Sequence, residues 1–215
     1  MLFRSGENAF HSCFKLVEVI NKSAHITVAK GGQDNGFAGC YALSVTNRDG
    51  NYISKVTMNT DGFVIYHDGA DKLLITFVGE KTDITLPDGV TKIYNKAFES
   101  NERLTSVIIP DSVTEIGAYA FSNCTNLTSV SIGNGVKRIL SMAFHECRNI
   151  ANLTIGNGVE SIGTLAFFFN LDKLENLIYT GTKDEWNAIS KPNDWKAQNK
   201  NGNIYITCRD GKVKL

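Results

Sequence analysis

The sequence predicts an α/β solenoid, in which short coils of equal length stack along one axis. Three observations support this fold class. The dipeptide Ala-Phe recurs four times at a constant interval of 23 residues, columns of valine and isoleucine keep the same interval, and apolar residues alternate with polar ones after each dipeptide; the four phenylalanines are Phe98, Phe121, Phe144 and Phe167. A fixed interval of this length indicates stacked repeats, because one unit cannot bury its apolar side without neighbours.

Each unit contains a segment with the spacing of a leucine-rich-repeat strand. In one unit, Leu104, Val107 and Ile109 match the spacing L-x-x-L-x-L. Val107 and Ile109 are two residues apart, so both side chains should point into the core, while Ser106 and Ile108 should point outward. We therefore expect a right-handed leucine-rich-repeat solenoid with a parallel β-sheet on its concave face.

The rest of each unit returns the chain to the next strand. Pro110-Asp111 follows the strand and suits a turn. Val113 and Ile116 then indicate a short extended return, and the Ala-Phe pair indicates a tight helical turn that places Phe121 in the interior. Short return strands and helical turns are therefore expected on the convex side.

The repeat divides the chain into five parts. We expect a foreign or artefactual leader at residues 1–5, a partial N-terminal coil at 6–24, a β-rich insertion at 25–80, coils of 23 residues at 81–178 and a C-terminal cap at 179–215. Phe10 precedes Phe98 by 88 residues, which is not a multiple of 23, so the segment between them is not simply more coils. Because the chain opens inside a coil, we expect it to be a fragment of a longer protein.

The insertion and the cap have their own local patterns. Residues 53–58, 63–66 and 73–78 predict a β-meander whose turns lie at 59–62 and 67–70. In the cap, Thr182 and Glu185 have the spacing of a capping box, so a short helix should begin there. A strand at residues 204–208 and Trp195 should help to cover the last coil.

Composition excludes several classes of function. Lys plus Arg equals Asp plus Glu at 22 each, which predicts no attraction to nucleic acid. No apolar run approaches the roughly 20 residues of a membrane helix, so no membrane insertion is expected. Cys124 and Cys147 occupy one column of adjacent coils, where a disulfide bond is geometrically possible, but their parallel inward directions favour free thiols.

No motif in the sequence carries chemistry. It contains no G-x-S-x-G nucleophile and no phosphate loop, and the segment His145-Glu146-Cys147 follows the repeat register, so packing accounts for it. Asp61, Asp68 and Asp71 could bind calcium, but aspartate is an ordinary turn residue. We therefore predict no catalytic residue, no metal site and no cofactor, and the chain is not expected to be an enzyme.

The outward side chains of the predicted sheet form a small polar surface with little charge. Such a surface suits adaptable hydrogen bonding to a protein or a glycan. The alternative interpretation is that these residues only solvate a regular sheet. The candidate binding residues are Ser106, Ile108, Ser129, Ser131, Asn152, Thr154, Asn176 and Ile178.

The unit written Ala120-Phe121-Ser-Asn-Cys124-Thr-Asn-Leu127 closely resembles the BspA-like leucine-rich-repeat family, the treponemal type with 23-residue repeats. The ending Tyr179-Thr-Gly-Thr-Lys-Asp-Glu-Trp186 is similar to that family's usual terminator. Two features depart from the pattern: Leu140 stands where glycine is usual, and Phe168-Phe169 thickens the last full coil.

The resemblance implies a secreted or surface-displayed protein of a host-associated microbe, without catalytic residues. We expect a non-enzymatic protein-interaction or adhesion module at an extracellular or cell-surface location, although the sequence contains no signal peptide. Its partner would be a host matrix or surface protein or a glycan, and the chain itself is expected to be a monomer. The alternative is a structural spacer or stalk whose insertion, not its concave sheet, meets the partner.

Overall fold

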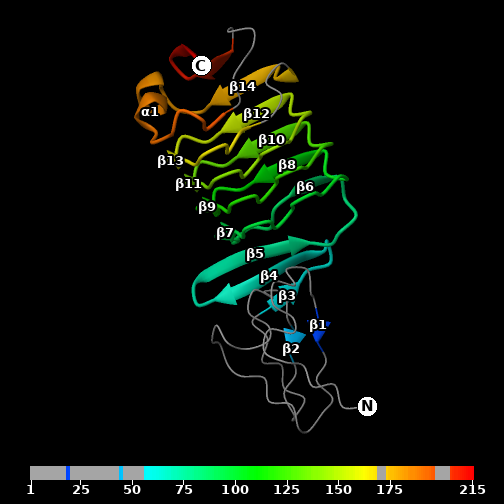
Figure 1. The fold of residues 1–215 in the computed structure, drawn as a ribbon. Helices are drawn as coiled ribbons and strands as arrows, with labels where there is room; N and C mark the ends of the chain where they lie inside the picture. The colour runs from blue at the N-terminus through cyan, green and yellow to red at the C-terminus, as the bar shows by residue number, and fades with distance from the viewer. Residues whose placement is uncertain (1–17, 20–43, 46–55, 169–172, 197–203) are drawn as a thin grey trace.

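The computed structural model describes residues 18–19, 44–45, 56–168, 173–196 and 204–215. The expected leader and most of the expected partial coil lie outside these residues. Two sheets of seven strands run along the stacked coils (Figure 1), and a separate parallel pair joins β1 (Glu18–Val19) to β2 (Ser44–Val45). The prediction of a solenoid built from stacked parallel strands is confirmed.

The first large sheet, here called the ladder sheet, contains one strand from each coil. Adjacent strands are parallel from β6 to β15, and β16 is antiparallel to β15. Within each repeat strand, buried apolar residues alternate with more exposed ones, as the sequence predicts. In spatial order the strands are β6 (Asp83–Thr85), β8 (Ser106–Ile109), β10 (Ser129–Ile132), β12 (Asn152–Ile155), β14 (Asn176–Tyr179), β15 (Tyr205–Cys208) and β16 (Gly211–Lys214).

The second large sheet, here called the return sheet, carries the chain back across each coil. Its spatial order is β13 (Ser161–Ile162), β11 (Arg138–Ile139), β9 (Glu115–Ile116), β7 (Lys92–Ile93), β5 (Asp71–Phe77), β4 (Phe63–Asp68) and β3 (Val56–Met58). The last three strands form an antiparallel meander where the sequence predicts one; residues 53–55 lie outside the described residues. Because Leu74 of β5 pairs in parallel with Ile93 of β7, the meander extends the return sheet.

The corners between the return sheet and the ladder sheet are turns, so the prediction of helical turns was wrong. In the corner after β9, the N–H groups of Ala120 and Cys124 donate to carbonyls three residues earlier, and Tyr119 and Asn123 have left-handed φ angles of 58° and 59°. The intervening N–H of Phe121 donates to the carbonyl of Ala143 in the next coil, at 2.8 Å. A helix would use this donor within its own coil, so bonding between coils selects the turns.

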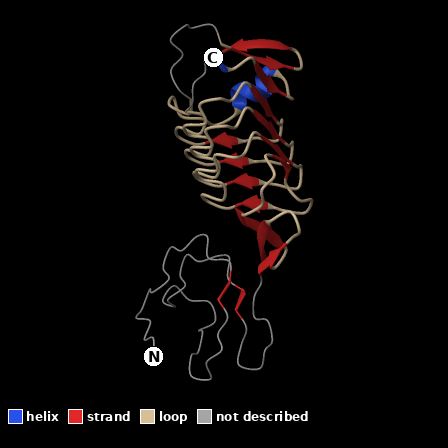
Figure 2. Ribbon diagram, turned by 90° about the vertical axis from the view of Figure 1, so that its right-hand side faces the viewer, coloured by secondary structure: helices blue, strands red, loops and turns tan. Residues whose placement is uncertain are grey.

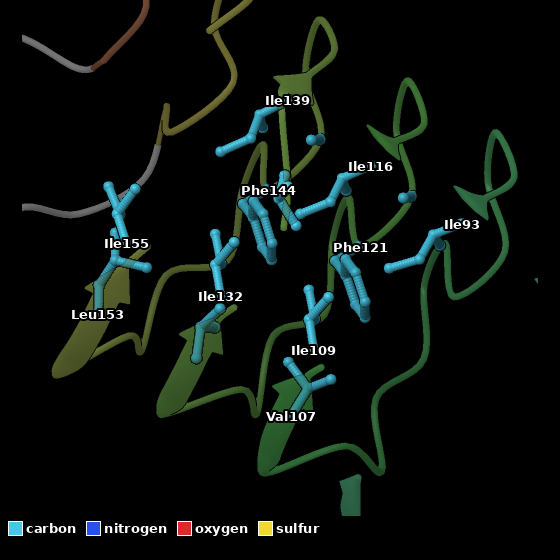
Figure 3. Close-up of a cluster of buried hydrophobic side chains, with 14 of the residues drawn as sticks. Ile93, Val107, Ile109, Ile116, Phe121, Ile132, Ile139, Phe144, Leu153 and Ile155 are labelled. Atoms are coloured by element: carbon cyan, nitrogen blue, oxygen red, sulfur yellow. The ribbon is translucent and has the colours of Figure 1, made fainter. Parts of the chain in front are cut away.

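The coil interior holds a stacked column of aromatic rings. Phe98, Phe121, Phe144 and Phe167 are all buried, and successive ring centroids lie 4.7, 5.0 and 5.3 Å apart with planes within 9° of parallel. Figure 3 shows Phe121 and Phe144 lying parallel between isoleucines of the ladder strands and of the return strands. The predicted buried column is therefore confirmed.

Both ends of this column are covered by further aromatic rings. At the N-terminal end, the ring centroid of Phe77 lies 5.8 Å from that of Phe98. At the C-terminal end, the ring of Trp195 meets that of Phe167 edge-on at 6.0 Å, and Trp186 of α1 (Lys183–Ala188) contacts Trp195 at 5.6 Å. The helix lies beside the last strands (Figure 2), and its capping box at Thr182 confirms the predicted start. The ends of the solenoid are thus covered from within the chain.

Cys124 and Cys147 are free, fully buried thiols, the state that the sequence favours. The Sγ of Cys124 donates to the carbonyl of Phe98 at 3.1 Å, and that of Cys147 donates to Phe121 at 2.9 Å. Burial raises the pKa of the Cys147 thiol well above its ordinary value. The third described cysteine, Cys208, is also a buried free thiol.

The coil keeps its shape at Leu140, where the repeat pattern has glycine. The N–H of Leu140 donates to the carbonyl of Ile116 at 2.9 Å, and the N–H of Gly163 makes the equivalent bond to Ile139 at 2.8 Å. The larger side chain is therefore accommodated without loss of the ladder bond. Phe168 projects outward, and its ring stacks on that of His145 at 5.5 Å.

Candidate ligand-binding face

The structure brings the eight candidate residues together in two rows on the outward face of the ladder sheet. The strands pair without a register shift, so Ser129 lies between Ser106 and Asn152, and Ser131 lies between Ile108 and Thr154. The first row contains Ser106, Ser129, Asn152 and Asn176, and the second contains Ile108, Ser131, Thr154 and Ile178. Their backbones are fixed by the sheet, so this surface is pre-organised.

Exposed apolar side chains concentrate on this face. Among the described residues, the five large apolar side chains that are exposed include Ile108 at 49%, Ile178 at 41% and Tyr205 at 46%, and all three belong to the ladder sheet. Contiguous apolar surface rimmed by polar residues marks interaction sites, whereas single exposed residues do not. Ile178 and Tyr205 lie on the adjacent strands β14 and β15, so the C-terminal end of this face carries two exposed apolar side chains on neighbouring strands.

Hydrogen bonds between neighbouring coils orient the first row. The Nδ2 of Asn176 donates to the Oδ1 of Asn152 at 2.6 Å. At the other end of the row, the hydroxyls of Ser106 and Thr105 donate to the Oδ1 of Asp83 at 2.5 and 2.9 Å. These bonds, with a third from Thr82, lower the pKa of Asp83, so its carboxylate is charged at neutral pH.

The face extends beyond the eight residues predicted from the sequence. Asp83 and Thr85 of β6 precede Ser106 and Ile108 by one interval of 23 residues, so the repeat itself could have located them. At the other end, Tyr205, Thr207 and Lys212 continue the face on β15 and β16. These cap residues follow no repeat interval, and no sequence signal placed them beside β14.

Two hollows border the C-terminal part of the face. The first, here called the seam pocket, has a volume of about 410 Å³ and lies where β14 and β15 pair only through Ile178 and Thr207. Its lining comprises Leu174, Glu175, Asn176, Leu177, Ile178, Ile204, Tyr205, Thr207 and Lys212. The second, of about 390 Å³, is lined by Asn126, Thr128, Asn149, Ala151, Lys173 and Glu175. Glu175 borders both hollows.

This surface offers hydrogen-bonding and apolar groups. Within the described ranges, no three His, Cys, Asp or Glu side chains gather closely enough to hold a metal ion. Of the aspartates considered as calcium ligands, Asp61 pairs with Lys81 at 2.5 Å and Asp71 pairs with Lys92. The described part of the chain also contains no helix with the length and hydropathy to cross a bilayer.

The parallel ladder, the 23-residue interval and the buried phenylalanine column together define a leucine-rich-repeat protein. A family model described as BspA type leucine rich repeat region matches residues 78–188 in six copies, just over half of the 215-residue chain. The chain belongs to this family. Among curated protein sequences, none matches the chain.

Several solved structures share the fold. A leucine rich repeat protein from T. pallidum is 24% identical with a TM-score of 0.53, and the match covers 62% of this chain and 63% of that one. The pneumococcal vaccine antigen PcpA is 17% identical with a TM-score of 0.60, over 78% of this chain and 39% of that one. A leucine-rich repeat protein from Bacteroides capillosus is 24% identical with a TM-score of 0.52, over 60% of this chain and all of that one. At these identities the likeness supports the fold alone.

Proposed function

We propose that the outward face of the ladder sheet binds a protein partner and that the chain is an adhesion module of a secreted or cell-surface protein. Proteins of this repeat family are generally protein-interaction modules. Binding by this face requires no chemical change in the partner. The partner class that fits the family resemblance is a host matrix or surface protein.

The observation that carries this proposal is the pair of unbroken rows across four strands. In the second row, the exposed Ile108 and Ile178 stand at the two ends, with Ser131 and Thr154 between them. Apolar contacts set among short polar side chains resemble the mixed composition of non-obligate protein interfaces. Because the side chains are short and the backbone is fixed, little conformational entropy is lost on binding.

The covered ends of the solenoid support a monomeric module. Repeat arrays need capping at both ends, because the last coil otherwise leaves its apolar interior open. Here Phe63 and Phe77 close one end, Trp186 and Trp195 close the other, and all four side chains are buried. Stacking on a second copy is therefore not needed to complete the core, and the ladder face stays free for a different partner.

A charge-introducing variant tests the proposal. The change is the triple substitution Ser129→Lys, Asn152→Lys and Thr154→Lys, which places three ammonium groups on the centre of the face. A matched control adds the same charge on the exposed surface of the cap through Asn187→Lys, Ala188→Lys and Asn193→Lys. The cap control changes exposed residues only and should keep the wild-type melting temperature. Ser129 and Thr154 are half-buried, so the melting temperature of the face triple is measured to check that the variant is folded before its binding is compared.

The readout is capture of a partner from extracellular-matrix and mucosal extracts, identified by mass spectrometry and then titrated in purified form. Wild type and the cap control should bind that partner equally, and the face triple should lose at least tenfold in affinity. Unchanged affinity in the face triple would refute the proposal. If deletion of residues 25–55 then abolished capture, the spacer alternative would replace it.

A further inference from the structure

The seam pocket combines an apolar floor with an exposed aromatic ring. Leu174 and Ile204 are partly buried and pack against the core, so their side chains form an apolar base. Tyr205 lines the same hollow with 46% of its surface exposed. Its neighbours on β15 alternate between buried and exposed, so the ring belongs to the outward face.

Polar groups without partners surround this floor. Among the described residues, the side chains of Glu175, Thr207 and Lys212 make no hydrogen bond or ion pair with another residue, whereas those of Asn152 and Asn176 bond to each other. Glu175 can accept, Lys212 can donate, and Thr207 can do both. The pocket thus has exposed donors and acceptors beside an apolar base, and its volume lies within the range of about 300–1,000 Å³ typical of small-ligand sites.

We propose that the seam pocket binds an N-acetylated amino sugar at the end of a glycan. A pyranose ring has one face of C–H groups, which stacks on an aromatic ring such as that of Tyr205, and a rim of hydroxyls that both donate and accept. Its acetamido group adds a methyl that suits the floor of Leu174 and Ile204. The amide N–H of that group suits Glu175, and its carbonyl suits Lys212.

A glycan fits this pocket better than an anchoring side chain of a protein. Protein hot spots bury an aromatic or aliphatic group in a well-packed, desolvated pocket. The seam pocket is lined by the exposed polar side chains of Glu175, Thr207 and Lys212 as well as by its apolar base, and its aromatic ring is exposed. The inference deepens the proposed function, because a glycosylated partner on the ladder face would bring a sugar to the adjacent seam.

The experiment compares two disaccharides that differ only in acetylated amino groups. Diacetylchitobiose and cellobiose share the same glucose-type rings and linkage, so any difference in binding reports on the acetamido groups. Binding to the intact chain is measured by saturation-transfer NMR and by titration calorimetry. Diacetylchitobiose should bind in the millimolar range, and cellobiose should bind at least tenfold more weakly.

Two point variants assign the binding to the pocket. Tyr205→Ala should weaken diacetylchitobiose binding at least tenfold, and Glu175→Gln should weaken it severalfold while the melting temperature is unchanged. Tyr119→Ala removes a tyrosine at a corner outside the pocket and should bind as wild type does. Absence of binding, equal affinity for both sugars, or unchanged affinity in Tyr205→Ala would each overturn the inference.

A reduced form of the face triple at Ser129, Asn152 and Thr154 separates this inference from the proposed function. None of these residues lines the seam pocket, but Asn152 accepts a hydrogen bond from Asn176, which does. The two-site form Ser129→Lys and Thr154→Lys leaves that bond in place, so it should retain diacetylchitobiose affinity even where it loses the protein partner. Loss of sugar binding with intact partner capture would refute the sugar inference alone. If Tyr205→Ala lost capture of a partner stripped of its glycans, the pocket would be a protein-binding site, which also overturns the inference.

Discussion

The rings of Phe121 and Phe144 stack with their centroids 5.0 Å apart and their planes 2° from parallel. The backbone imposes this geometry, because the N–H of Phe121 donates to Ala143 and that of Phe144 donates to Ala166. Each phenylalanine is therefore fixed relative to the next coil by a hydrogen bond at its own position. The rings therefore pack as one continuous column that runs from the meander to the C-terminal cap.

Removing one ring should open a cavity in the middle of this column. Phe121→Ala should lower the free energy of unfolding by about 3–5 kcal/mol, because both neighbouring rings lose their contacts and cannot close the gap. Urea denaturation followed by circular dichroism measures the effect. Phe168→Ala is the control. Because Phe168 is 37% exposed, this substitution should lower the free energy of unfolding by less than about 1 kcal/mol. Equal losses of unfolding free energy in Phe121→Ala and Phe168→Ala would contradict the central role of the column.

Close approach of successive coils makes Gly135 intolerant of a side chain. A Cβ added there would lie 1.7 Å from the carbonyl oxygen of Asp111 in the preceding coil. Gly135→Ala should therefore force the coils apart and cost about 1–3 kcal/mol in thermal or urea unfolding. At Gly69 an added Cβ meets nothing within 4 Å, so Gly69→Ala should cost about 1 kcal/mol, from its positive φ alone. A smaller loss at Gly135 than at Gly69 would contradict this packing argument.

Much of the solenoid could be predicted from the sequence because each coil repeats the same environment. The constant interval fixed the pairing of Ser129 with Ser106 and Asn152, and hence the two rows of the candidate face. The corners could not be predicted, because Tyr119 and Met142 adopt left-handed φ angles that the sequence signals only through glycine or asparagine. Bonds to the next coil hold them there.

The sequence likewise does not predict the seam pocket. It exists because β15, after a break in the repeat, rejoins the ladder sheet at Thr207 opposite Ile178. The 23-residue interval does not predict that pairing, because β15 lies outside the repeat. Its register depends instead on the tertiary packing of Ile206 and Trp186 in the last coil. Sequence periodicity thus locates the rows but not the hollow at their end.

The buried thiol of Cys147 should make stability depend on alkaline pH. Burial raises its pKa in the folded protein above the value in the unfolded chain, so its contribution is complete below the unfolded pKa of about 8.5 and is lost as the pH rises. Urea unfolding is measured at about pH 7.5 and at about pH 10.5. Between these two pH values, the free energy of unfolding should fall more in wild type than in Cys147→Ala. Equal losses would mean that this thiol does not contribute to the alkaline destabilisation.

The capping box of α1 should control how firmly the C-terminal end is closed. The Oγ1 of Thr182 accepts from the N–H of Glu185 at 3.2 Å, and the Oε2 of Glu185 accepts from the N–H of Thr182 at 2.7 Å. Thr182→Ala should cost about 1 kcal/mol and fray the helix that holds Trp186 over the last coil, which a red shift of tryptophan fluorescence before global unfolding would report. Thr182→Ser keeps the acceptor and should behave as wild type does. If Thr182→Ser lost as much stability as Thr182→Ala, packing of the threonine methyl group, and not the cap, would stabilise this end.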